Sequence, residues 1–127
     1  MITIEEILKS RIKYFTMSKS LKSNFNELFY KINIVRYFWN KPMIVNSGYR
    51  SPRYNKKIGG SANSHHCYCR AIDISDPNHE LYDWLVSGAG KVLSEKLGLY
   101  FEDKYYTKTW CHIQTRPPKS GGRVFKP

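Results

Sequence analysis

An aspartate, Asp73, interrupts the apolar segment Ala-Ile-Asp-Ile at residues 71–74. This short run predicts a buried strand in which Ile72 and Ile74 face one side and Asp73 the other. A carboxylate buried there without a partner is energetically expensive. The fold must therefore bring a cation to Asp73, and that cation is either an arginine or a metal ion.

Two histidines are placed to share a metal ion with Asp73. His66 precedes it at the end of a loop, and His112 lies in a second short apolar segment, expected on a neighbouring strand. Two histidines and one carboxylate are the protein ligands of a catalytic zinc site whose fourth position is left for water. Each residue taken singly is more often structural, so the inference depends on the combination.

The cysteines leave an alternative open. Cys67, Cys69 and Cys111 lie next to the proposed ligands and cannot all pair with one another, so a reducing compartment would leave them as thiols. We interpret them as small buried residues. A zinc site built from the Cys67-x-Cys69 pair and Cys111 is the alternative.

Apolar periodicity predicts the elements of the first half of the chain. Thr3 and Glu6 form a capping-box signature, which predicts that a helix begins here. A second run with apolar residues three and four apart ends before Pro42. The expected elements are helices over 3–14 and 23–40 with a loop at 16–20, a strand over 43–47, a turn or helical turn at 51–55 and a loop at 59–64.

The second half is expected to supply most of the sheet. We predict strands over 70–74, 99–101 and 109–114, the last two forming a hairpin through residues 103–108. Between the strands over 70–74 and 99–101, apolar residues over 81–97 predict one helix, which Gly88 and Gly90 weaken and which ends at Gly98. Trp110, His112 and Gln114 share one face of the last strand. Val124 and Phe125 are expected to fold back onto the body.

The predicted fold class is α+β, with a small antiparallel sheet that carries the zinc site and packs against two or three helices. A chain of 127 residues is the size of one domain. We divide it into N-terminal helices (1–40), a core with the metal site (41–114) and a C-terminal tail (115–127), and expect a monomer. No run of 18 apolar residues exists, so membrane insertion is not expected. The first residues lack the build of a signal peptide, which suggests synthesis in a cytoplasm.

Three motifs together resemble a known family: Ser-Gly-Tyr-Arg-Ser at 47–51, Ser64-x-His66 with Arg70-Ala71-x-Asp73-Ile74, and Trp110-x-His112. They look like the zinc D-alanyl-D-alanine peptidases, or hedgehog-like metallopeptidases. That family contains bacterial carboxypeptidases and dipeptidases and the L-alanyl-D-glutamate endopeptidases of bacteriophage lysis. The resemblance covers residues 41–114, and the segment 112–127 looks most like the phage members.

The resemblance implies that His66, Asp73 and His112 bind zinc and that Arg50 holds or polarises a carbonyl or carboxylate of the substrate. Zinc lowers the pKa of its bound water to about 7, which gives a nucleophile for amide hydrolysis. Ser64, Tyr68 and Trp110 are the further substrate-binding candidates, although core packing explains Tyr68 and Trp110 equally well.

The chain departs from the family pattern at the expected general base. Many members carry a glutamate three residues before the last histidine, where this sequence has Thr109, which cannot accept and return a proton. The nearest acids are Glu102, which can reach the site across the hairpin, and Asp103. We predict Glu102 as the catalytic base, with Asp103 as the second choice.

The expected function is that of a hydrolase: a zinc metallopeptidase that cuts a peptidoglycan stem peptide as a carboxypeptidase or an endolysin. It would degrade the host cell wall for a bacteriophage, either after release from the cytoplasm or as part of a virion. The net charge of +11 suits an anionic cell wall. Thr109 supports an alternative, a catalytically impaired zinc domain that binds the wall or serves as a virion structural module. Charge alone supports nucleic acid as a partner, and no nucleic-acid-binding motif accompanies it.

Overall fold

The computed structural model describes the whole chain, residues 1–127. The helices are α1 (Ile4–Leu8), α2 (Lys19–Trp39), α3 (Pro52–Lys57), α4 (Glu80–Val86) and α5 (Lys91–Leu97), with short 3-10 turns η1 (Tyr14–Thr16) and η2 (His65–Tyr68). The strands are β1 (Val45–Ser47), β2 (Ala71–Ser75), β3 (Tyr100–Glu102), β4 (Trp110–Gln114) and β5 (Val124–Phe125). The α+β fold class is thus confirmed, and β1 to β4 agree with the predicted strands to within one or two residues at each end.

The five strands form one sheet in the order β1-β2-β4-β3-β5. Neighbouring strands are antiparallel except for β3 and β5, which are parallel. The predicted antiparallel arrangement is thus found for β1 to β4, and the parallel pairing of β5 with β3 makes the sheet mixed. After β4 the tail turns back, so β5 runs in the direction opposite to β4. Because β3 is antiparallel to β4, β5 is parallel to β3.

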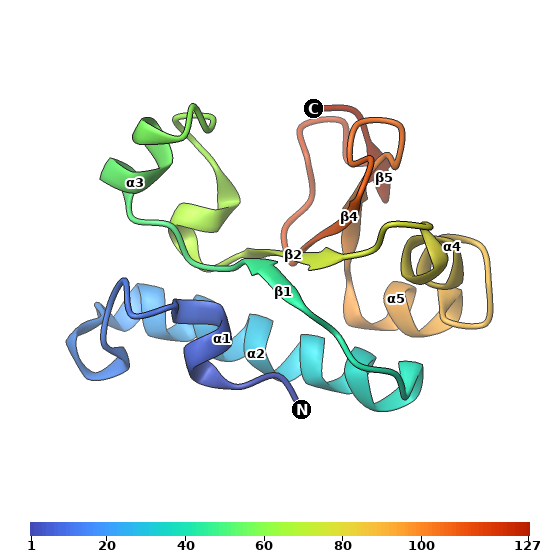
Figure 1. Cartoon of the computed structure of the whole chain (residues 1–127), viewed down its shortest axis with the longest axis horizontal. Helices are drawn as coiled ribbons and strands as arrows, with labels where there is room; N and C mark the ends of the chain where they lie inside the picture. Colours follow the sequence, from blue (N-terminus) through green and yellow to red (C-terminus); the bar gives the residue numbers. More distant parts are fainter.

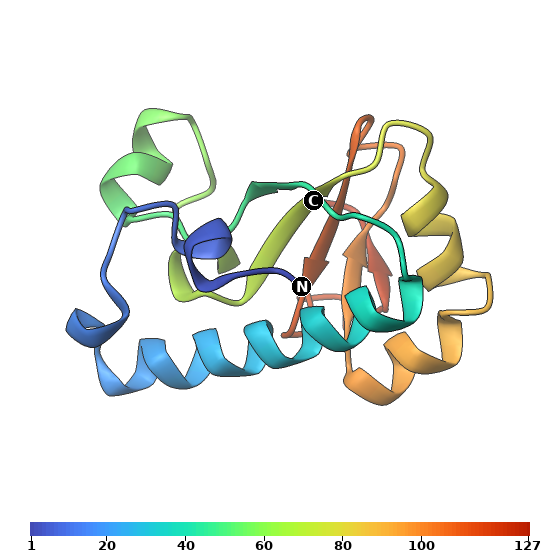
Figure 2. The ribbon, with the colours of Figure 1, turned by 60° about the horizontal axis from the view of Figure 1, so that its bottom comes forward.

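The helix α2 covers one face of this sheet (Figures 1 and 2), while α3 lies near one end of the molecule and α4 with α5 near the other. Strand residues and α2 residues share one core, whose members include Phe25, Leu28, Ile32, Val35, Ile72, Ile74, Cys111 and Ile113. Because side chains alternate along a strand, Asp73 and His112 project from the opposite face. None of the helices combines the length and apolar character needed to span a bilayer.

The first two helices differ from their predicted bounds for local reasons. The helix α1 ends at Leu8 instead of continuing to residue 14, because Lys9 adopts a left-handed backbone conformation with φ 50°. The carbonyl of Ile7 then accepts a hydrogen bond from the amide of Tyr49 at 2.9 Å. The helix α2 begins before the predicted residue 23, because the Ser18 side chain caps it by accepting from the amide of Leu21.

The predicted helix over 81–97 is two helices. The helix α4 ends at Val86, and α5 begins at Lys91 after a turn that contains Gly88 and Gly90. A Cβ at Gly90 would lie 2.6 Å from a ring atom of Trp84, so the turn needs a residue without a side chain here. The glycines end the first helix and let the second fold back against it.

Gly48 follows β1 directly and packs against the backbone of α1. A Cβ at this position would lie 2.3 Å from the Ile7 carbonyl oxygen, and neither backbone can easily move. We expect Gly48→Ala to lower the free energy of unfolding by about 3 kcal/mol, the upper end of the range for overpacked interiors, because the clash is with backbone atoms. Denaturant unfolding measures the loss. Gly59→Ala is the matched control: nothing lies within 4 Å and φ is +77°, so it should cost only about 1 kcal/mol of backbone strain. Equal losses in the two variants would contradict the clash at Gly48.

Candidate metal centre

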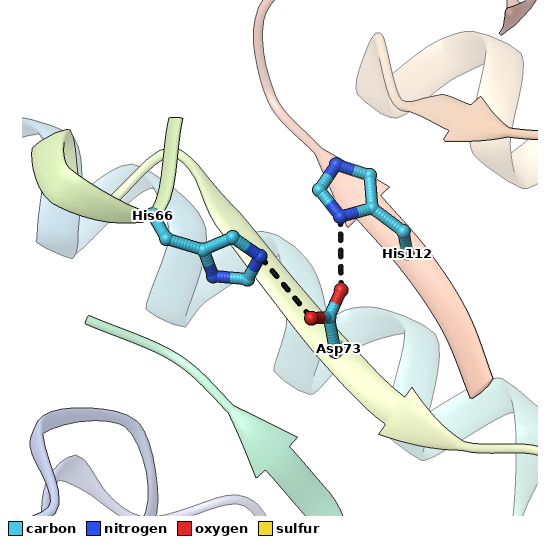
Figure 3. Close-up of side chains that lie close together, drawn as sticks. All are labelled: His66, Asp73 and His112. Carbon is cyan, nitrogen blue, oxygen red and sulfur yellow. Dashed lines mark hydrogen bonds and ion pairs between the residues drawn. The ribbon is translucent and has the colours of Figure 1, made fainter. Parts of the chain in front are cut away.

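His66, Asp73 and His112 meet on the open face of the sheet (Figure 3). Asp73 in β2 and His112 in β4 are direct cross-strand partners, and η2 brings His66 over the same face. Asp73 Oδ1 lies 2.9 Å from His112 Nδ1, and Asp73 Oδ2 lies 3.2 Å from His66 Nε2. One ligand atom from each residue falls within 4.8 Å of the other two. The structure thus brings together the three residues that the sequence predicts as metal ligands.

The backbone carbonyl of Gly48 fixes the ring of His66. Its oxygen lies 2.8 Å from His66 Nδ1. A carbonyl only accepts hydrogen bonds, so Nδ1 carries the proton and the lone pair of Nε2 faces the Asp73 carboxylate. A lone pair and a carboxylate oxygen repel each other unless a cation lies between them. Two buried imidazoles and one carboxylate are a donor set of catalytic zinc sites, so these residues fit the metal.

The charges of the three residues also suit a cation. Burial alone would raise the pKa of Asp73, but the adjacent imidazoles of His112 and His66 outweigh burial and hold that pKa below the ordinary carboxyl range. Burial lowers the pKa of His66, and Asp73 offsets this only in part. For His112, the contact with Asp73 outweighs burial and raises the pKa. The carboxylate therefore stays ionised at neutral pH, as a metal ligand must.

Arg50 lies beside the carboxylate, at the start of the turn into α3. Its Nη2 atom is 3.6 Å from Asp73 Oδ2, and its Nε atom donates to Ser47 Oγ at 3.1 Å. The side-chain oxygen of Asn55 accepts from Arg50 Nη1 at 3.3 Å, and Asn55 in turn donates to the Ser61 carbonyl. These contacts hold the guanidinium in place at the edge of the site.

A cavity of about 210 Å³ opens over the three residues. Its lining residues are Arg50, Ser61, Ser64, His66, Asp73, Glu102, Trp110 and His112. Besides the three metal-ligand candidates, five residues therefore surround the space that a substrate would enter. Arg50, Ser64, Glu102 and Trp110, which the sequence analysis names as catalytic or substrate-binding candidates, are in this set.

The hairpin carries Glu102 to the cavity. Tyr100 pairs with Gln114 in the sheet, so Tyr100 and Glu102 lie on the same face as His112. Burial raises the pKa of Glu102, the nearby Asp73 charge raises it further, and His112 opposes both effects. A half-buried carboxylate with a raised pKa beside a cleft has the properties of a general base.

One predicted substrate-binding residue, Tyr68, lies elsewhere. It is 45% exposed, packs against the guanidinium of Arg70 and is not among the residues that line the cavity. Thr109, at the position of the expected glutamate, is exposed and does not line the cavity either. The cysteines Cys67, Cys69 and Cys111 are free thiols and belong to no cluster of potential metal ligands.

Sequence reasoning missed two polar residues of the site. Asn55 is 2% exposed and holds Arg50, and Gln114 is 2% exposed with its Oε1 atom 2.8 Å from His112 Nε2. The shared strand face of His112 and Gln114 was a signal for the second, because alternate residues of a strand are neighbours. Nothing in the sequence marks Asn55, since its role depends on how the loop at 59–64 folds over it.

A small α+β domain with a 2-His-1-Asp centre beside an arginine and a glutamate defines a metallohydrolase type of site. The sequence profile of the peptidase M15 family matches residues 2–113, most of the chain. The chain therefore belongs to the peptidase M15 family, whose members are zinc metallopeptidases, and its cofactor is zinc. A search of curated proteins found no match.

Proposed function

We propose that this protein is a zinc-dependent peptidase that hydrolyses a peptide bond in the stem peptide of bacterial peptidoglycan. The bond is of the kind cut by D-Ala-D-Ala carboxypeptidases or L-Ala-D-Glu endopeptidases. The observation that carries the proposal is the convergence of His66, Asp73 and His112 on one position beneath an open cavity. The family match supports the peptidase class.

The residues around this position have separate roles in the proposed reaction. Zinc, when bound, supplies an activated water and polarises the scissile carbonyl. Arg50 stabilises negative charge that develops on the carbonyl oxygen, or holds a substrate carboxylate. Glu102 accepts a proton from the attacking water and returns it to the leaving amine. Ser64 and Trp110 line the cavity and contact the peptide.

We place the reaction in cell-wall degradation by a bacteriophage, with the protein made in the cytoplasm and acting on the wall after release or within a virion. The net charge of +11 supports this setting, because it attracts the protein to an anionic wall. Such attraction between exposed charges weakens as salt is added.

The proposal is tested by a digest of defined muropeptides, followed by mass spectrometry. A product cut at one stem-peptide bond, formed with zinc and absent with a strong chelator, is the expected result. A zinc-loaded protein that binds cell walls and releases no product from any muropeptide would overturn the peptidase proposal. It would favour the second candidate, a zinc-bearing wall or virion module, for which Thr109 at the usual glutamate position is the specific reason.

Arg50→Gln tests the role of the guanidinium. We expect kcat/KM for a muropeptide to fall about 100-fold with the zinc content unchanged, since one donor to a developing oxyanion is worth roughly 3 kcal/mol. The matched control is Arg53→Gln, at an exposed position of α3 outside the cavity lining, which should keep wild-type kcat/KM. Equal activity of the two variants would show that Arg50 does not act on the substrate.

A further inference from the structure

We propose that Gln114 is a positioning residue for His112: its side-chain oxygen accepts the Nε2–H of the imidazole and so selects the tautomer whose Nδ1 lone pair faces Asp73 and the metal position. This inference rests on the proposed zinc function and deepens it. It assigns a role to a residue that touches neither the metal nor the substrate.

The hydrogen bonds of Gln114 allow only one orientation of its amide. The Nε2 atom lies 2.8 Å from the backbone oxygen of Arg116, and the Oε1 atom lies 2.8 Å from His112 Nε2. Because a carbonyl oxygen only accepts, the amide NH₂ must point at Arg116, which leaves the amide oxygen for the histidine. The reversed amide would place two oxygens against each other in a site where Gln114 is 2% exposed. An oxygen facing His112 Nε2 requires a proton on that nitrogen.

The carbonyl that fixes Gln114 is itself fixed by α2. The guanidinium of Arg116 pairs with Glu27 at 2.6 Å and lies 3.4 Å from Asn24 Oδ1. The neighbouring amide of Thr115 donates to the Arg70 carbonyl at 2.9 Å. These contacts tie residues 115 and 116 to the segment before β2 and to the long helix, and so keep the Arg116 carbonyl in place as the acceptor for Gln114.

Without this acceptor, the other tautomer of His112 becomes favourable. Its Nδ1 atom lies 2.9 Å from Asp73 Oδ1, so a proton on Nδ1 would make a good hydrogen bond to the carboxylate. That proton would occupy the lone pair that the metal needs. By holding the proton on Nε2, Gln114 keeps Nδ1 free of a proton and available to the metal. Partners of this kind typically change metal affinity by about 10- to 100-fold.

The experiment compares Gln114→Met, which keeps the length of the side chain but lacks the amide oxygen, with Gln114→Glu, which restores an acceptor. Zinc dissociation constants are measured by chelator competition. The ring tautomer of His112 is read from ¹⁵N–¹H correlation spectra of the metal-free protein, at a pH high enough for the imidazole to be neutral. We expect wild-type His112 to carry its proton on Nε2, and Gln114→Met to bind zinc about 10- to 100-fold more weakly with the proton moved to Nδ1. Gln114→Glu keeps the acceptor for His112 but sets a second oxygen against the Arg116 carbonyl, so it should hold the proton on Nε2 and recover the zinc affinity only in part.

The control variant is Ile113→Val, a buried neighbour that faces the core on the other side of the sheet. It should lower the melting temperature without changing zinc affinity or the tautomer, which separates positioning from general stability. Wild-type His112 protonated on Nδ1 would overturn the inference without recourse to any variant. So would a Gln114→Met protein with wild-type affinity and tautomer, and the peptidase proposal would then still stand. A wild-type protein that binds no zinc would instead overturn the proposed function, and the tautomer would still decide the role of Gln114.

Discussion

Replacing Asp73 by asparagine is expected to remove both zinc and activity. Asp73 is 7% exposed and lies between both histidines, and it is the only carboxylate in the cluster of potential metal ligands. Asparagine keeps the shape but removes the negative charge that balances the metal ion. We expect less than one zinc in ten chains to remain, and cleavage of muropeptides to fall by more than about 1,000-fold, since a catalytic metal supplies several kcal/mol. Elemental analysis and the muropeptide digest measure the two effects.

Asp76→Asn is the matched control for this variant. Asp76 is also buried, at 5% exposed, but its carboxylate accepts from the amides of Leu81 and Tyr82 at the start of α4. Its loss should lower stability and leave the zinc content unchanged. If Asp73→Asn retained one zinc per chain, the assignment of the ligand set would be wrong.

The metal-free protein gives a second readout of Asp73. A carboxyl group whose pKa is lowered in the folded state stabilises the fold fully above its ordinary value of 3.8 and loses this contribution as the pH falls toward the lower folded-state pKa. The stability of metal-free wild type should therefore decline in acid more steeply than that of Asp73→Asn.

Glu102→Gln is expected to separate zinc binding from catalysis. The variant keeps the size and shape of the side chain but cannot take up a proton, and Glu102 is not one of the metal-ligand candidates, so zinc should bind as in wild type. The turnover of muropeptides should fall by roughly 100- to 10,000-fold, which is the usual contribution of a positioned acid or base. Metal analysis and single-bond cleavage rates on the same sample measure both quantities.

The neighbouring acid supplies the comparison. Asp103 accepts from the amide of Tyr105 and does not line the cavity, so Asp103→Asn should keep most of the activity. If instead Glu102→Gln remains active while Asp103→Asn does not, the base is Asp103. If both remain active, neither carboxylate is the base, and the zinc site can still be right.

The strands of the sheet and the metal-ligand candidates could be predicted from the alternation of side chains along short segments. Alternation along 71–74 and 110–114 was enough to place Asp73 and His112 on one face, because a strand cannot turn a single side chain to the other side. The predicted hairpin also placed Glu102 near that face. These inferences succeeded because each depends on neighbours close in sequence or on one strand pairing.

The errors concern contacts between distant segments. The early end of α1 at Leu8 depends on the Ile7 carbonyl bonding to Tyr49, and the parallel pairing of β5 depends on where the tail passes β3. The support of Arg50 by Asn55 likewise exists only once the loop at 59–64 has folded. No periodicity or spacing encodes such contacts, so sequence patterns alone do not reveal them.

The pairing of β5 with β3 has a practical consequence for preparing the protein. The amide of Asp103 donates to the Phe125 carbonyl, and the Phe125 ring lies 6.0 Å from that of His112, so the last residues border the cleft. The amino end instead lies on the α2 side of the molecule, where the amide of Ile2 donates to Asn33 (Figures 1 and 2). Affinity tags therefore belong at the amino end, because a histidine tag fused after Pro127 would put competing imidazoles within reach of the metal position.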